Sequence, residues 1–339
     1  MKKNIVRESP FEYLRDKNGN KFSEETVKNW YKARAYVLDR LGGNQQNVVV
    51  DGDSPLMLSV VRHLALYAHY ISDKPTVITL VGQNDNIEDE LKKEEYLCYL
   101  VDYLKRADCD LDIELQIAKE VPGYFQGITI TENDVNDFIN KKNHDEIYTI
   151  DTRKAALAQK IYELGAVIDN LPAEDIHCTK RYAMALESFE YNLLEDEINP
   201  LIDKAQWENN PIKVKNGISS IYSADCFELR AFAMKNDKKN DYHIWEENNE
   251  ALSISEHARW VVERLIMGYR SINQNERMQY EILFGQKRQD YFKKLKNNPQ
   301  DLVHIDICSY HDLRRIDPNS LKYDSFLMLA IPRILERLK

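Results

Sequence analysis

Three side chains suited to binding a small ligand share one flank of a predicted helix. His257, Trp260 and Arg264 lie three and four residues apart, and at about 100° per residue they fall on the same side of an α-helix. An indole offers a flat surface for a purine-like or other flat group. A guanidinium offers a planar fork of donors to phosphate or carboxylate, and an imidazole can change charge near neutral pH. The flank is therefore a candidate ligand site, although periodicity alone favours a core edge with an ion pair at Arg264.

The helix that carries this flank is predicted to begin at a capping box, Ser253-Ile-Ser-Glu256, and to end near Gly268. Glu263 and Arg270 should point nearly away from the core. After the helix stops, Tyr269 and Arg270 are expected to approach a ligand from the loop side. One wide apolar face should meet the core, and it comprises Ile254, Ala258, Val261, Val262, Leu265 and Tyr269.

A second group of candidates follows near the C-terminus, in His304-Ile-Asp-Ile-Cys-Ser-Tyr310 and in Lys322-Tyr-Asp324. We expect His304 and Tyr310 to close a pocket over the flank that carries Trp260. For Tyr310 the alternative is a buried tyrosine whose hydroxyl bonds to backbone.

Together with Ser255–Arg270 and Ala330–Leu335, these blocks resemble the ryanodine-receptor repeat domain, a small helical module of calcium-release channels and many bacterial proteins. The resemblance covers roughly residues 243–339 and implies a ligand-sensing unit rather than an enzyme. Two prolines that usually stand in the family's second block are replaced by Ile305 and Ser309, so this loop is expected to be looser or to be stiffened in another way. The residues that match the family's pattern are His257, Trp260, His304, Tyr310 and Lys322.

The N-terminal half alternates predicted strands with predicted helices, which is typical of a mostly parallel sheet covered on both faces. The predicted strands are Val48–Asp51, Thr76–Val81, Asp112–Ile117, Gly127–Thr131 and Glu146–Ile150. The predicted helices are Glu24–Leu41, Leu56–Tyr70, Ile87–Arg106, Arg153–Leu164 and Lys180–Leu194, with caps at Ser23 and Ser54. The chain is therefore expected to be an α/β protein in which a Rossmann-like domain precedes a small, mainly α-helical one.

Four segments are predicted along the chain. Residues 1–40 form a helical N-terminal extension, 41–205 a Rossmann-like domain, 206–242 a linker with a connecting helix, and 243–339 the module that resembles the ryanodine-receptor repeat. Bacterial proteins of this kind pair the module with a Rossmann-like domain of the TrkA-N type, and they are associated with nucleotide signalling and conflict systems. The resemblance therefore implies a nucleotide or nucleotide-derived ligand.

The turn after the first predicted strand is a second candidate site. A glycine-rich fingerprint at such a turn can hold a pyrophosphate at the N-terminus of the following helix. Of its three glycine positions only Gly52 is kept, since Ser54 and Met57 stand at the other two, and Asp53 adds a negative charge. Gly52, Asp53 and Ser54 are thus the cofactor-binding residues of a weakened nucleotide site, or merely the cap of an ordinary helix.

Composition narrows the classes of function. A net charge of −10 at pH 7 argues against nucleic acid as the main partner. The longest apolar stretch, Pro55–Ile71, is interrupted by arginine and histidine, and no secretory signal is found, so we expect no membrane partner and a cytoplasmic location. Five scattered cysteines predict reduced thiols. Metal-ligand spacing and catalytic motifs are not found, so an enzyme is the less favoured class.

These features favour a soluble two-domain sensor that binds a small ligand and transmits the event through its Rossmann-like domain. Two alternatives stay open. One is an NAD(P)- or nucleotide-using enzyme at the Gly52 turn, and the other is a scaffold that docks a protein through a flat apolar patch around Trp260. A homo-oligomer or an effector protein as the partner is also left open.

Overall fold

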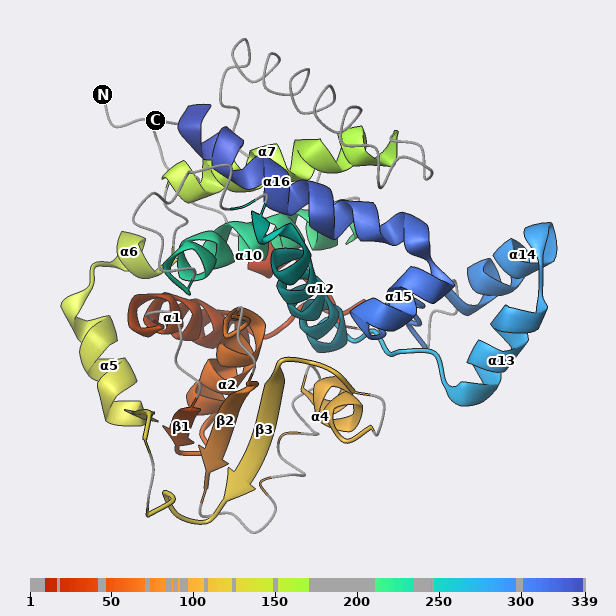
Figure 1. The fold of residues 1–339 in the computed structure, drawn as a ribbon. Helices are drawn as coiled ribbons and strands as arrows, with labels where there is room; N and C mark the ends of the chain where they lie inside the picture. Colours follow the sequence, from red (N-terminus) through yellow and green to blue (C-terminus); the bar gives the residue numbers. More distant parts are fainter. Residues whose placement is uncertain are drawn as a thin grey trace.

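The computed structural model is a mixed α/β structure in which a parallel sheet and several long helices contribute to one core (Figure 1). The residues that the structure describes are 10–16, 19–41, 47–70, 74–82, 87, 91, 97–106, 109–123, 126–148, 152–170, 211–233, 245, 247–296 and 301–337.

Four parallel strands form the sheet, in the order β3-β2-β1-β4. They are β1 (Asn47–Asp51), β2 (Thr76–Val81), β3 (Ile113–Ala118) and β4 (Ile128–Thr131). β1 pairs with β2 on one side and β4 on the other, and its three valines are fully buried because both faces of the sheet are covered. The predicted parallel sheet is confirmed, and its order is consistent with one half of a doubly wound fold.

Two capped helices pack beside the sheet. α1 (Glu24–Arg40) begins after Ser23, and α2 (Pro55–Tyr67) begins after Ser54 with Pro55 in its first turn. Each serine hydroxyl accepts a hydrogen bond from a backbone N–H of the first turn, so both predicted caps are confirmed. α1 packs along α2 and shares the core of the sheet.

The segment Glu146–Ile150, predicted as a strand, is instead helical up to Tyr148, in α6 (His144–Tyr148). Asn143 and Glu146 explain the difference, because each side chain accepts a hydrogen bond from the backbone N–H of the other. This reciprocal arrangement is a capping box, and it is also how α5 (Glu132–Lys141) begins. A local cap thus overrides the strand preference of Ile147 and Tyr148, and residues 149–150 lie outside the described residues.

Four long helices pack together beyond the sheet and its two capped helices. They are α7 (Thr152–Asp169), α10 (Pro211–Ala233), α12 (Asn249–Ile266) and α16 (Leu321–Arg337). α7 packs against both α10 and α16, and α12 runs between this group and the sheet (Figure 1). Because α10 spans residues 211–233, this part of the predicted linker is one continuous helix. The predicted helix Lys180–Leu194 lies outside the described residues, as do residues 206–210 and 234–242 of the linker.

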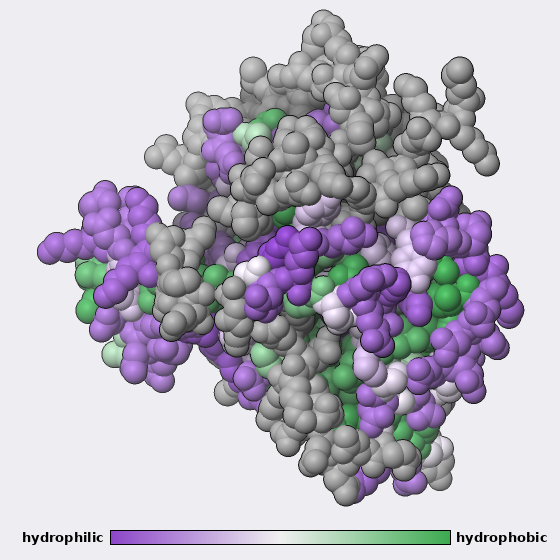
Figure 2. Space-filling view, turned by 180° about the vertical axis from the view of Figure 1, so that it is seen from behind, coloured by the Kyte–Doolittle hydropathy of each residue, from purple (hydrophilic) through white to green (hydrophobic). Residues whose placement is uncertain are grey.

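A helical hairpin projects from this body (Figure 1). It consists of α13 (Gln274–Ile282) and α14 (Gly285–Lys296), and mostly hydrophilic residues cover it, as the lobe at the left of Figure 2 shows. Met278, Ile282 and Phe284 are its exposed apolar side chains. The chain then returns through α15 (Tyr310–Ile316) and the short 3-10 helix η3 (Pro318–Ser320) to α16.

The packing is continuous across the predicted domain boundary. Tyr222 on α10 and Val261, Val262 and Leu265 on α12 belong to the same hydrophobic core as the strands, and α4 (Cys98–Leu104), within the predicted helix Ile87–Arg106, packs on α12 and β3. The boundaries themselves stay predictions. Within the described ranges, no helix combines the length and the apolar character needed to cross a bilayer.

Candidate functional site

A cavity of about 500 Å³ lies among α7, α10, α12, α16 and the segment that precedes α15. Its volume falls within the range of about 300–1,000 Å³ that is usual for small-molecule sites. Four of the eight ligand-binding residues predicted from the sequence line it, namely His257, Trp260, Arg264 and His304. The predicted flank of α12 therefore borders a hollow instead of a closely packed interface.

Trp260 is the centre of an aromatic group on the cavity wall. Its ring lies 5.0 Å from the ring of His304 at an angle of 80°, and 5.9 Å from the ring of His257 at 21°. The guanidinium of Arg264 lies over the same indole, 5.2 Å from its centroid, which is a cation–π contact. These contacts hold the indole beside the cavity, which Trp260 lines.

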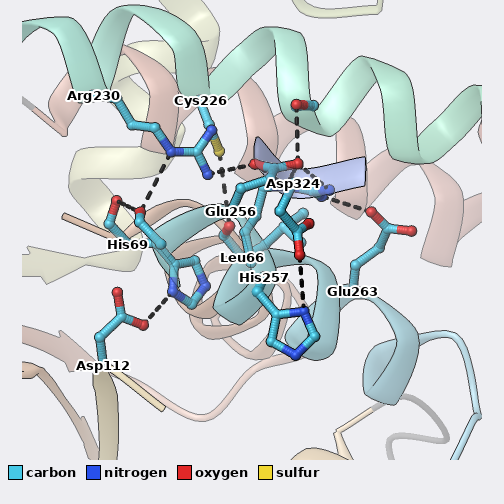
Figure 3. A network of polar contacts seen from close by, with 12 residues as sticks. Leu66, His69, Asp112, Cys226, Arg230, Glu256, His257, Glu263 and Asp324 are labelled. Atoms are coloured by element: carbon cyan, nitrogen blue, oxygen red, sulfur yellow. Dashed lines mark hydrogen bonds and ion pairs between the residues drawn. The ribbon is translucent and has the colours of Figure 1, made fainter. Parts of the chain in front are cut away.

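His257 is held through both of its ring nitrogens. Nδ1 lies 3.2 Å from Oδ2 of Asp324 on α16 (Figure 3), and Nε2 lies 3.0 Å from the carbonyl oxygen of Cys308. Burial alone would lower the pKa of His257, but the hydrogen bond and charge of Asp324 outweigh it and raise this pKa above its ordinary value. Through these two contacts His257 joins α12 to α16 and to the segment before α15, and it forms a fixed part of the wall.

Arg264 is a cation of the wall with unused donors. The residue is 9% exposed, and its Nε has no acceptor among the described residues. One terminal nitrogen lies 3.5 Å from Oε1 of Glu263, which is a long contact for an ion pair. Because a guanidinium carries five N–H donors, Arg264 retains donors for an anionic group in the cavity.

A buried network of charges lies beneath this wall (Figure 3). Both carboxylate oxygens of Glu256 accept from Nε of Arg259 at 3.0 Å, and a terminal nitrogen of Arg230 on α10 lies 2.7 Å from one of them. Arg259 also donates to Glu263 at 2.6 Å. Each of these four side chains is at most 3% exposed. The network holds Glu263 in place beside Arg264.

The sequence does contain a signal for this network that the prediction does not use. Glu256, Arg259 and Glu263 are spaced three and four residues apart, which places alternating charges in contact along one helix face. Such a face is usually exposed to solvent. That it is buried here follows from the tertiary structure, in which Arg230 on α10 packs against Glu256.

The helix that carries these residues differs from its prediction at three points. α12 begins at Asn249, one turn before the predicted capping box, so Ser253 lies inside the helix and donates to the carbonyl of Asn249. Ile254, expected in the core, is 45% exposed, and Glu263, expected to face away from it, is fully buried. The reason is that α12 contacts α2, α4, α10, α15 and α16, so protein charges cover its polar face. The predicted end is confirmed, since Gly268 follows with a φ of +85°.

Tyr269 and Arg270, predicted to bind ligand, lie outside the cavity lining. The hydroxyl of Tyr269 accepts from Nζ of Lys215 at 3.2 Å. Both terminal nitrogens of Arg270 donate to Glu276 at 2.8 Å, and its Nε donates to Asp301 at 2.6 Å. The donors of Arg270 are therefore engaged by protein carboxylates, and this residue joins α13 to the segment before α15.

Tyr310 and Lys322 are buried behind the cavity wall and do not line it. The ring of Tyr310 meets that of His257 at 5.6 Å and 62°, so it supports a lining residue. Nζ of Lys322 lies 5.5 Å from the ring centroid of Tyr323, which does line the cavity. Both residues thus position the wall from outside.

The loop before α15 is stiffened by a cap. Ser309 accepts a hydrogen bond from the backbone N–H of Asp312 at 2.8 Å and so caps α15. This serine stands where the resembled family usually has a proline. Of the two expectations for the loop, the cap supports the one in which it is stiffened in another way.

The acidic side of the cavity is not among the predicted site residues. Asp306 and Asp324 line it together with Ser320. The Ser320 hydroxyl lies 3.2 Å from Oδ2 of Asp306 and 3.0 Å from Oδ2 of Asp317, and its one proton can serve either acceptor. Oδ1 of Asp306 is buried without a hydrogen-bond partner among the described residues. Burial, assisted by the charge of Asp317, raises the pKa of Asp306 to about 7. The sequence signal for Asp306 is weak, because one aspartate between two isoleucines is typical of an exposed position.

We expect the change Asp306→Asn to remove a pH dependence of stability. The pKa of this carboxyl is about 7 in the folded protein and 3.8 ordinarily, so the unfolded chain ionises first and stability is lost as the pH rises from about 4 toward 7. Between pH 5 and pH 8 the native protein should lose on the order of 2–3 kcal/mol through this group, at about 1.4 kcal/mol per pKa unit. Urea denaturation of both proteins at both pH values measures the loss, and parallel losses contradict the expectation.

The Gly52 turn lies at the other end of α2 from the cavity. Gly52 has a φ of +133°, and its N–H donates to the carbonyl of Val81 at 2.9 Å. The opposite end of α2 is followed by His69, whose carbonyl accepts from Ser255 on α12 at 3.1 Å. The 13 residues of α2, at about 1.5 Å each, separate the turn from α12 by roughly 20 Å. The two candidate sites are therefore distinct.

The local geometry at this turn suits an ordinary capped helix. The hydroxyl of Ser54 accepts from the backbone N–H of Met57 at 3.4 Å, and a Cβ at Gly52 would lie 3.3 Å from Cγ of Met57. The side chain of Asp53 lies beside Gly82, where a Cβ would come within 3.0 Å of its Oδ2. Gly52, Asp53 and Ser54 thus form a turn and a cap, outside the cavity lining.

Comparison with known proteins adds no further assignment to these residues. Among the residues that the structure describes, no group of three or more side chains is arranged to hold a metal ion. The chain matches no protein-family model, no curated protein and no solved structure.

Proposed function

We propose that this protein binds a small nucleotide-derived ligand in the cavity beside Trp260 and acts as its sensor. The observation that carries the proposal is the concavity itself, because an indole, an imidazole and a guanidinium of α12 border about 500 Å³ of space. The resemblance of residues 243–339 to the ryanodine-receptor repeat, with bacterial members associated with nucleotide signalling, supports the same class of ligand.

The wall favours a flat group joined to an anion. Trp260 and His304 contribute aromatic rings, and stacking on such rings is the usual way to hold a nucleobase. Arg264 contributes donors that the protein leaves unused, and a guanidinium suits a phosphate. Ser219 on α10 adds a residue with a hydroxyl to the lining. A nucleotide combines the flat group and the anion in one molecule.

Binding would be transmitted to the sheet through α12. This helix lines the cavity on one side and packs against α2 and α4 on another. Ser255 on α12 is also hydrogen-bonded to the carbonyl of His69, just after α2. A ligand that favours one position of α12 between α16 and α2 shifts the population of that arrangement, and this is how a sensor passes on occupancy.

The two alternatives have less support. A docking scaffold needs a flat apolar patch around Trp260, whereas this residue borders a cavity that also contains charged residues. An enzyme at the Gly52 turn needs unused donors at the start of α2, whereas the backbone N–H of Met57 there already donates to the Ser54 hydroxyl.

The change Trp260→Ala tests the proposal. Isothermal titration with a panel of nucleotides and cyclic nucleotides should identify a ligand of the native protein. Because base–aromatic stacking contributes about 1–3 kcal/mol per base, the alanine variant should bind that ligand roughly 10- to 100-fold more weakly. Trp260→Phe keeps an aromatic face and should retain most of the affinity.

The matched control is Phe284→Ala, which removes an aromatic ring that is 76% exposed on the distant α13–α14 hairpin. This control should bind the ligand as the native protein does. The proposal fails when no nucleotide in the panel binds, or when Trp260→Ala and Phe284→Ala bind with equal affinity.

A further inference from the structure

One carboxylate of the cavity stands next to its aromatic group. The backbone N–H of Asp306 lies 3.3 Å from Nδ1 of His304, and Oδ2 of Asp306 lies 3.8 Å from the same nitrogen. The ring of His304 in turn meets the indole of Trp260 at 5.0 Å. Asp306, His304 and Trp260 thus follow one another along the wall, and all three line the cavity.

The carboxylate of Asp306 has acceptor capacity that the protein does not use. Oδ2 lies 3.2 Å from the Ser320 hydroxyl, while Oδ1 is buried and accepts from no described residue. A carboxylate has about four lone-pair sites, and buried acceptors are nearly always satisfied. A rotation of the carboxyl group that turns the buried Oδ1 toward the cavity would let two adjacent N–H groups of a ligand satisfy both oxygens of Asp306.

Arg264 provides the opposite pole. It is nine-tenths buried and its Nε has no acceptor among the described residues, so it has donors where Asp306 has acceptors. Trp260 contacts Arg264 on one side and His304 on another, and His304 in turn lies beside Asp306. The cavity therefore pairs an anion-binding pole with a pole that accepts N–H groups, and aromatic rings lie between them.

We propose that the ligand is a guanine nucleotide, with guanine against the Trp260–His304 rings, its N1–H and exocyclic amine on Asp306, and its phosphate on Arg264. This inference rests on the proposed function and names the base. Guanine is the common nucleobase that presents two adjacent donors to one carboxylate, and such paired, charge-assisted hydrogen bonds combine strength with geometric specificity. Adenine presents an acceptor at N1, which a carboxylate repels.

The pairing also predicts the pH dependence of binding. The groups that act on Asp306 are Asp317 after α15, Asp324 on α16, His257 on α12 and the hydroxyl of Ser320. Guanine donors need the ionised carboxylate, so the affinity should fall as the pH is lowered below about 7, where the pKa of Asp306 lies. His304 lies beside the same carboxylate and can also titrate in this range of pH. The Asp306→Asn variant removes the titration of Asp306 and leaves that of His304.

Asp306→Asn provides a reciprocal test of the base. The amide can accept from N1–H but it donates where the carboxylate accepts, so it suits xanthine, whose 2-oxo group accepts a hydrogen bond. By isothermal titration, the native protein should bind GMP at least about tenfold more tightly than IMP, which lacks the exocyclic amine, and than XMP or AMP. Asp306→Asn should reverse the order of GMP and XMP, and its affinity should fall less between pH 8 and pH 6 than that of the native protein for GMP, because only His304 and the ligand phosphate still titrate there.

The matched control is Asp290→Asn, on the exposed face of α14, and it should keep the native order. Equal binding of GMP and IMP, or an order that Asp306→Asn leaves unchanged, overturns the guanine assignment. If AMP binds instead and Trp260→Ala abolishes its binding, the guanine assignment falls while the proposed function stands. If no nucleotide binds, both fall.

Discussion

Replacing Glu256 by alanine is expected to lower the free energy of unfolding by roughly 3–5 kcal/mol or to prevent folding. Glu256 accepts from Arg259 with both oxygens at 3.0 Å, lies 2.7 Å from a terminal nitrogen of Arg230, and accepts from Ser223 at 3.1 Å. Alanine would leave two buried guanidinium groups without this shared partner. Loss of a partner of a buried charge costs far more than loss of a surface ion pair.

Urea denaturation followed by circular dichroism measures this effect. The matched control is Glu250→Ala on the same helix, because the Glu250–Arg314 pair is largely exposed and should change stability by no more than about 1 kcal/mol. Equal losses for the two variants would contradict the role of the buried network. A Glu256→Gln variant, which keeps some hydrogen bonds but loses the charge, should fall between Glu256→Ala and the native protein.

The buried network also forms part of the wall of the candidate site. Glu256 and Arg259 both line the cavity, but their charges compensate each other within the protein. Arg259 also holds Glu263 at 2.6 Å, and Glu263 lies 3.5 Å from Arg264. The paired charges therefore lie directly beside Arg264, which lines the cavity.

Asp225→Ala is expected to have a comparable effect, again roughly 3–5 kcal/mol. Asp225 on α10 accepts from Nε and a terminal nitrogen of Arg34 on α1, at 2.8 and 2.7 Å, and from the hydroxyl of Tyr67 on α2 at 2.8 Å. Lys154 on α7 lies 3.6 Å away. The side chains of Arg34 and Asp225 are 6% and 0% exposed, so the single variant leaves a buried arginine unpaired.

A double variant, Arg34→Met with Asp225→Leu, separates the pair from its surroundings. Removing both charges should restore most of the stability lost in Asp225→Ala, since apolar replacements of a buried ion pair are often neutral. The coupling energy between the two residues comes from urea denaturation of four proteins: the native protein, Arg34→Met, Asp225→Leu and the double variant. Additive losses would show that Arg34 and Asp225 do not act as a pair.

The pH dependence of this pair has a defined direction. Burial alone would raise the pKa of Asp225, but the charges of Arg34 and Lys154 and its hydrogen bonds lower it below 3.8. The stability that Asp225 adds is therefore present above its ordinary pKa and lost as the pH falls below it. The native protein should lose this contribution on acidification, and the double variant should not.

Local sequence patterns determined much of the secondary structure. Ser23 and Ser54 predict the starts of α1 and α2, and Gly268 predicts the end of α12, because these effects act within one helical turn. The buried β-branched runs Val48–Val50 and Thr76–Val81 predict β1 and β2, and their alternation with helices predicts a parallel sheet. The strand predicted at Glu146–Ile150 is wrong for residues 146–148, because the cap formed by Asn143 and Glu146 stabilises a helix there, and residues 149–150 lie outside the described part of the chain.

Helical spacing by itself also determined that His257, Trp260 and Arg264 share one flank, because their angular separation depends only on the geometry of an α-helix. Whether that flank meets a cavity, a packed core or solvent was decided by α7, α10 and α16, which come from segments far away in the chain. The same holds for Glu263, whose burial depends on partners around α12, and for Asp306, which lines the cavity with Ser320 and Asp324. Periodicity encodes which residues share a face, whereas the environment of that face depends on long-range packing that no local pattern contains.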